Sequence, residues 1–107
     1  MLLAGTIFIT STAVLNEAAN SLCKPKYRGA VVEFYKRLQN SQRIKTVFVD
    51  ESLWSLGWKL FEERPDKSWG LTDFISMEIM RKYKLRDALT NDIHFNQAGF
   101  NALLRKK

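Results

Sequence analysis

Arg64-Pro-Asp-Lys-Ser-Trp-Gly-Leu-Thr-Asp73 is followed further along the chain by Ala88-Leu-Thr-Asn-Asp-Ile-His-Phe-Asn-Gln-Ala-Gly-Phe100. Each segment places an acidic residue where the secondary structure is predicted to change. Asp73 begins a predicted helix, and Asp92 follows a predicted short strand. Carboxylates at the ends of elements in an α/β framework can gather around a hard divalent cation. The pattern therefore favours a metal-dependent hydrolase as the first hypothesis.

Outward from these segments, predicted strands alternate with predicted helices, which is typical of a parallel α/β sheet. Hydroxyls of Thr10, Ser11 and Thr12 can cap the first helix, Ser52 can cap the third, and Pro25 interrupts the helical pattern. The run 47–49 suggests a strand buried on both faces. The predicted strands are 7–9, 44–49 and about 88–90, and the predicted helices are about 13–22, 27–39, 52–64, 72–83 and a turn at 102–104.

The composition bounds the class of protein. A chain of 107 residues predicts a single domain, 1–107, and no apolar run approaches the length of a membrane span. We interpret residues 1–10 as a strand and not as a signal peptide.

The formal charge of +6 is compatible with a nucleic-acid partner, although solvated helix faces explain it equally well. The one cysteine, Cys23, excludes an internal disulfide, suits a reducing cytoplasm and is interpreted as a passive, buried or half-buried thiol.

Each acidic residue has an ordinary structural interpretation beside the functional one. Glu17 is either exposed on the flank of the first helix or held against a metal. Asp73 can cap its helix, Asp92 can bond its own backbone in a turn, and Asp66 is better explained by a turn or a surface ion pair. Taken together, three of these carboxylates could converge at one sheet edge, where Mg²⁺ or Mn²⁺ would relieve their mutual repulsion.

Other candidate sites are weaker. The only histidine, His94, is interpreted as a structural donor, and one His with one Cys provides no zinc constellation. Trp54, Trp58 and Trp69 could stack on nucleobases, but packing in the core or along a helix is the favoured interpretation.

The two quoted segments closely resemble the C-terminal half of PIN domains, nearest to the toxin-like branch of bacterial toxin–antitoxin pairs. The segment Ile9-Thr-Ser-Thr-Ala-Val-Leu-Asn-Glu17 resembles the family's second strand and the helix that carries its glutamate. Glu17, Asp73 and Asp92 match three of the family's four acidic positions, and Thr72 and Thr90 match positions that commonly flank the site. Phe74 and Met77 depart from the family's usual Cys and Phe, which are apolar exchanges that should affect packing more than chemistry.

The resemblance implies an α/β, Rossmann-like three-layer sandwich with a short parallel sheet flanked by helices. It also implies a cytoplasmic endoribonuclease that hydrolyses RNA phosphodiester bonds with Mg²⁺ or Mn²⁺. Glu17, Asp73 and Asp92 are then the metal ligands and catalytic residues, with Thr72 and Thr90 in support. RNA and an antitoxin-type protein are the implied partners.

One departure is large. The family's first strand ends in an aspartate followed by Thr or Ser, and nothing in this sequence matches it, so we expect an N-terminally incomplete PIN-like domain. An open slot in the sheet could be filled by pairing between two copies, which predicts a homodimer. The alternative function is a catalytically incomplete module that binds RNA or a protein partner without cleavage.

Overall fold

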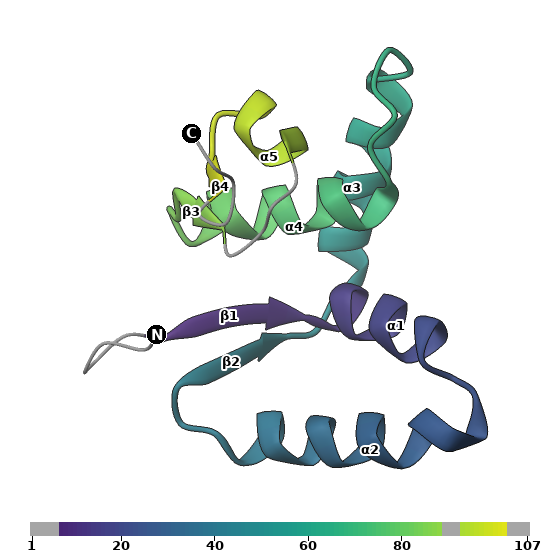
Figure 1. Ribbon diagram of the computed structural model, residues 1–107. Helices are drawn as coiled ribbons and strands as arrows, with labels where there is room; N and C mark the ends of the chain where they lie inside the picture. Colours follow the sequence, from purple (N-terminus) through teal and green to yellow (C-terminus); the bar gives the residue numbers. More distant parts are fainter. Residues whose placement is uncertain (1–6, 89–92, 103–107) are drawn as a thin grey trace. The chain divides into compact units, whose positions relative to one another are not determined.

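A parallel pair of short strands forms the centre of the first part of the chain. The computed structural model describes residues 7–88 and 93–102, and it divides into an N-terminal unit, Met1–Val49, and a C-terminal unit, Asp50–Lys107, which are described separately. In the N-terminal unit, β1 (Phe8–Ser11) pairs with β2 (Ile44–Val47) so that Phe8 lies opposite Ile44. Helices α1 (Thr12–Ser21) and α2 (Pro25–Asn40) connect the two strands, and α2 returns the chain to the start of β2 (Figure 1).

Local hydrogen bonds explain where α1 begins. The Ser11 side chain accepts a bond of 3.3 Å from the Val14 amide, which confirms the predicted hydroxyl cap. The neighbouring Thr12 hydroxyl accepts a bond of 2.9 Å from the Val49 amide. That bond fastens the chain just after β2 to the first turn of α1, so both strands lead into one shared junction.

The predicted break in the helical pattern at Pro25 is found, since α1 ends at Ser21 and Pro25 opens α2, where a proline loses no hydrogen bond. Two other expectations for the N-terminal unit are wrong. Cys23 is exposed in the short connection before α2, and not buried. The run 47–49 is not buried on both faces, since Phe48 follows the last residue of β2 and is 67% exposed.

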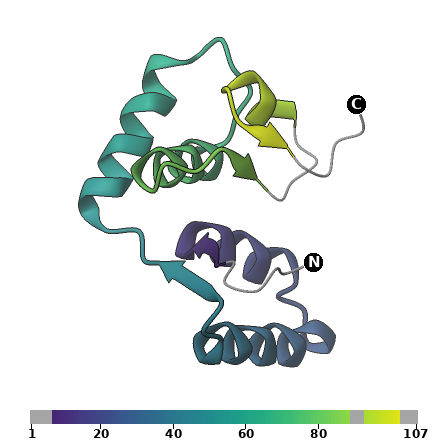
Figure 2. The same ribbon diagram turned by 90° about the vertical axis from the view of Figure 1, so that its left-hand side faces the viewer.

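Two crossing helices form the framework of the C-terminal unit, α3 (Glu51–Glu63) and α4 (Leu71–Lys82) (Figure 2). Asp50, and not Ser52 as predicted, caps α3, because its carboxylate accepts a 2.8 Å bond from the Leu53 amide. Gly57 permits the close approach of the two helices: a Cβ placed there would lie 2.5 Å from Ile75 Cγ1. The prediction that α4 is apolar on more than one side is confirmed by its buried residues, Phe74, Ile75, Met77, Ile79 and Met80.

The end of the described chain differs from its prediction. A second parallel pair joins β3 (Asp87–Ala88) to β4 (Asn101–Ala102), with α5 (Ile93–Gln97) between them. Ala102 therefore lies in a strand and not in the predicted final helical turn, and α5 was not predicted. Backbone pairing explains the difference, since the Asn101 amide donates to the Arg86 carbonyl at 2.7 Å and the Asn101 side chain donates to Asp87 at 3.0 Å.

The core of the C-terminal unit forms where α4 and α5 meet. Its buried members are mostly large and aromatic or sulfur-containing, and partly buried residues such as Leu60 and Phe100 pack against them. No described helix has the length and apolar character needed to cross a membrane. The buried members of this cluster are Trp69, Phe74, Met77, Met80 and Phe95.

Candidate metal centre

Asp73 lies in the first turn of α4, as the sequence predicts. Its Oδ2 atom accepts a 3.0 Å hydrogen bond from the Gly70 amide at the start of the helix. This contact satisfies a backbone donor that the helix itself leaves unpaired, and the negative charge lies at the favourable end of the helix dipole. The capping interpretation of Asp73 is therefore confirmed. The side chain stays 27% exposed, so the same carboxylate is accessible to an ion from solvent.

His94 approaches Asp73 from the other side. Its Nδ1 atom lies 3.9 Å from Asp73 Oδ2, and its ring centroid lies 5.7 Å from that of Trp69. The two residues come from α4 and α5 and are 21 positions apart in the sequence. The sequence predicted His94 to be a structural donor but gave no indication that it lies close to Asp73. This closeness depends on the tertiary packing of α5 and could not be predicted from local sequence.

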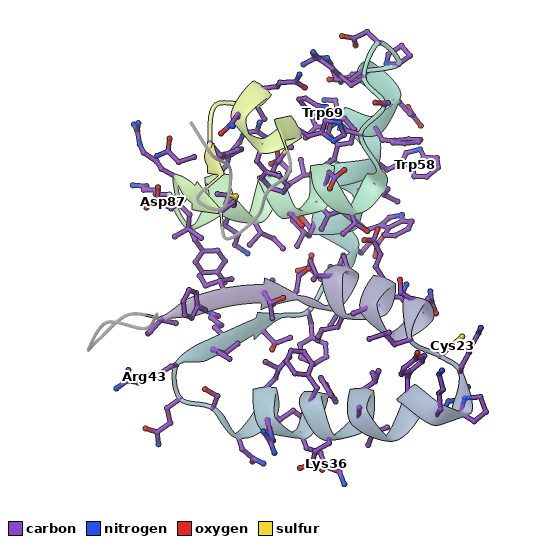
Figure 3. The ribbon with its side chains drawn as sticks, in the orientation of Figure 1. Cys23, Lys36, Arg43, Trp58, Trp69 and Asp87 are labelled. Carbon is purple, nitrogen blue, oxygen red and sulfur yellow. The ribbon has the colours of Figure 1, made fainter. Side chains whose placement is uncertain are left out.

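Trp69 forms an aromatic wall beside this pair. Trp69, which is labelled in Figure 3, is buried, as the packing interpretation predicts. Its ring lies 5.5 Å from that of Phe74. Lys67 and Arg64 hold their cationic groups 5.3 Å and 5.9 Å from the Trp69 ring centroid. The loop before α4 therefore holds two cationic groups near the Trp69 ring, and one of them, Arg64, is paired with Asp66.

Asp66 belongs to the same loop and has a structural role. Its two oxygens accept bonds of 3.2 Å and 3.3 Å from Arg64. The hydrogen bond from Arg64 lowers the pKa of Asp66, and the same bond raises the pKa of Arg64. The surface ion pair that the sequence favoured is therefore confirmed.

The remaining predicted site residues fall into three cases. Glu17 lies on α1 and is exposed, but it belongs to the N-terminal unit, so its convergence with Asp73 stays a prediction. Thr72 is half-buried in the first turn of α4, directly beside Asp73. Thr90 and Asp92 lie outside the described residues. Within the described ranges, no three His, Cys, Asp or Glu side chains form a group that could hold a metal ion.

Trp54 and Trp58 have a different environment from Trp69. They stack on one another along α3 with ring centroids 6.3 Å apart, and Phe61 extends the row 5.5 Å beyond Trp58. Trp54 is 49% and Trp58 43% exposed, and the Trp58 ring nitrogen donates to Glu62. The helix-packing interpretation holds for their mutual contact, yet the row also presents an apolar stripe to solvent.

The chain resembles a protein of known structure in its fold. No model of a known protein family matches the chain, and no curated protein matches it. Among solved structures, VapC20 of Mycobacterium tuberculosis, a toxin that cleaves the sarcin-ricin loop, has a TM-score of 0.79 and 24% sequence identity. The match covers 91% of this chain and 74% of VapC20. The chain therefore has an α/β fold with short parallel strands flanked by helices, and its resemblance to PIN domains is confirmed as a likeness of fold.

Proposed function

We propose that this chain is a PIN-family, metal-dependent endoribonuclease with a toxin-like role. The observation that carries the proposal is the partly exposed Asp73 carboxylate, fixed at the start of α4 by the Gly70 amide. It stands at the position that the sequence resemblance assigns to a metal ligand, on a fold shared with an RNA-cleaving toxin. Because a shared fold does not determine activity, the proposed activity rests on the residues of this site.

Glu17, Asp73 and Asp92 would hold Mg²⁺ or Mn²⁺, since carboxylate oxygens are the preferred ligands of these ions. The bound cation would activate water and neutralise charge on the scissile phosphate. Asp73 fits this role because Gly70 fixes its orientation before any ligand arrives. Lys67 and Arg64, on the loop before α4, would draw the RNA phosphate toward it. Thr72 and Thr90 would orient the neighbouring carboxylates through their hydroxyls.

Cleavage of RNA tests the proposal directly. We expect purified protein to cleave RNA with Mg²⁺ or Mn²⁺ and to stop when EDTA removes the ion. Asp73→Asn and Asp92→Asn should each lower the initial rate at least about a hundredfold, because even groups that only support metal ligands are worth about 10–100-fold. In Asp73→Asn the amide oxygen can still accept from Gly70, so the helix start is preserved.

Glu51→Gln is the matched control, since it removes one negative charge from an exposed position of the same unit without touching a proposed ligand or the partner of Arg64. Its rate should stay within about twofold of the wild type, as exposed surface changes usually have little effect. Cleavage that persists in the Asp73 and Asp92 variants would contradict the proposal. RNA binding with no cleavage in any metal would favour the alternative, a catalytically incomplete module, which rests on the match of only three of the family's four acidic positions.

RNA and an antitoxin-type protein are the partners we propose, and a homodimer is the proposed assembly. The exposed apolar row Trp54, Trp58 and Phe61 on α3 supports a protein partner, because contiguous apolar surface of this kind marks interaction sites. Sedimentation of the purified chain tests the dimer, and a monomer at all concentrations would contradict it.

A further inference from the structure

Positive charge is unevenly distributed between the two units. The described residues of the N-terminal unit contain seven Lys or Arg and two Glu, whereas those of the C-terminal unit contain seven Lys or Arg and eight Asp or Glu. All seven cations of the N-terminal unit are exposed. Among the described residues, the excess of basic over acidic side chains therefore belongs to the N-terminal unit. The seven exposed cations of the N-terminal unit are Lys24, Lys26, Arg28, Lys36, Arg37, Arg43 and Lys45.

Helix α2 concentrates this charge on one face. Its inward stripe is formed by Val31, Tyr35 and Leu38, which are the less exposed positions of the helix. Lys26 and Arg37 are separated by three helical turns and share the opposite face, about 17 Å apart along the axis, and Lys36 lies next to Arg37. In Figure 3, Lys36 projects from α2 on the side away from the strands, and Arg43 projects from the turn that leads into β2.

Carboxylates do little to neutralise this face. The ion pair given by the structure for α2 joins Arg37 to Glu33 at 3.9 Å, with side chains 80% and 59% exposed, and such exposed pairs are weak. In the C-terminal unit, Lys59 lies 3.9 Å from Glu63 in a similarly exposed pair, and Arg81 lies 2.6 Å from Glu78. The two units differ in numbers: the described residues of the C-terminal unit carry eight carboxylates and seven cations, whereas α2 carries four cations and one carboxylate. The cations of α2 therefore create a potential that favours a polyanion.

Aromatic surface borders the same helix. Phe34 is 53% exposed and lies three positions before Arg37, so the two side chains are neighbours on the surface of α2. The exposed Phe48 lies on the inward side of the helix instead, where it lines a groove of about 290 Å³ with Tyr35 and Leu38. A basic track with planar rings beside it suits single-stranded RNA, because phosphates bind the cations and bases stack on the rings. An acidic protein would use the charge but would not need the rings.

We propose that the outer face of α2, continued by the turn before β2, binds the phosphate backbone of single-stranded RNA, with a base stacked on Phe34. The choice of RNA rests on the proposed function, but the binding surface is separate from the proposed metal ligands. RNA should therefore bind in EDTA, where no cleavage occurs. This separation makes the two proposals distinguishable: Asp73→Asn should lower the cleavage rate at least about a hundredfold without weakening RNA binding in EDTA, whereas the α2 double variant should lose affinity.

The test measures the affinity of a short, fluorescent, mixed-sequence single-stranded RNA by anisotropy in EDTA, over a range of KCl concentrations. The double variant Lys36→Gln/Arg37→Gln should bind about tenfold more weakly, and its log–log salt slope should fall by about 1.4, since each lost phosphate contact on a single strand is worth about 0.7. Glu33→Gln should bind about threefold more tightly, because it removes the carboxylate beside Arg37. Phe34→Ala should weaken binding about tenfold through lost stacking.

The matched control is Lys59→Gln/Lys82→Gln, which removes the same charge from exposed positions of the C-terminal unit. Its affinity should stay within about twofold of the wild type. Equal losses in the two double variants would overturn the proposal, because the attraction would then come from net charge alone. An absence of RNA binding in EDTA would also overturn it, as would polyglutamate that competes as strongly as RNA, which would assign the surface to an acidic protein.

Discussion

The two units of this molecule differ in where they place their apolar side chains and where they place their charge. Among the described residues, eight of the nine buried apolar side chains belong to the C-terminal unit, and Leu38 is the one in the N-terminal unit. The N-terminal unit instead exposes cations and aromatic rings along α2 and β2. The main buried core and the proposed RNA-binding surface therefore belong to different units. Substitutions can change the stability of one without changing the RNA affinity of the other.

The largest effect on stability should come from the core of the C-terminal unit. Met77 is 1% exposed and belongs to the cluster that contains Trp69 and Phe95. Met77→Ala should lower the free energy of unfolding by about 2–5 kcal/mol, because the lost contacts leave a cavity. Val32→Ala on α2, where the valine is 49% exposed, should change it by less than about 0.5 kcal/mol. Urea unfolding of both variants measures the contrast, and equal losses would contradict the comparison.

A matched pair of glycine substitutions should give a smaller effect of opposite sign in the two units. Gly57→Ala in α3 should destabilise by about 1–2 kcal/mol, since the new Cβ would lie 2.5 Å from Ile75 Cγ1 and overpacking exceeds the gain in helix propensity. Gly29→Ala in α2 meets no atom within 4 Å and should stabilise by up to about 1 kcal/mol. Thermal unfolding distinguishes the two, and a stabilising Gly57→Ala would show that α3 and α4 are not in close contact.

The smallest effect should come from the Arg64–Asp66 pair at the surface. The bond from Arg64 lowers the pKa of Asp66 in the folded state. A lowered pKa contributes stability above the ordinary aspartate pKa of about 3.9, and that contribution is lost as the pH falls through the folded pKa. Asp66→Asn should therefore reduce the dependence of the melting temperature on pH below about 4. An unchanged pH dependence in this variant would contradict the role of the pair.

Elements with a strong local signal were predictable from the sequence. The apolar pattern of α4 and the acidic residue in its first turn were predicted and are found, because both depend on helical spacing and on the unpaired amides of a helix start. The Ser11 cap and the Asp66 ion pair were predictable for the same reason: their partners are within a few residues.

Features that depend on distant partners were not predictable. The contact of His94 with Asp73, the pairing of β3 with β4 and the exposure of Phe48 are set by segments far apart in the sequence. Short strands such as β3 and β4 contain no usable periodicity, so a two-residue pair could not be separated from a helical turn. The wrong cap for α3 has another cause, since Asp50 and Ser52 are both good capping residues and only the geometry selects between them.

The central claim is that carboxylates distant in the sequence hold one divalent cation. Its most direct test is a crystal structure of the Asp66→Asn protein and of the wild type grown with Mn²⁺, with the ion located by its anomalous scattering. We predict one Mn²⁺ within about 2.0–2.6 Å of oxygens of Glu17, Asp73 and Asp92 in both crystals. Carboxyl groups of these three residues on separate surfaces, with no anomalous peak beside Asp73, would contradict the account.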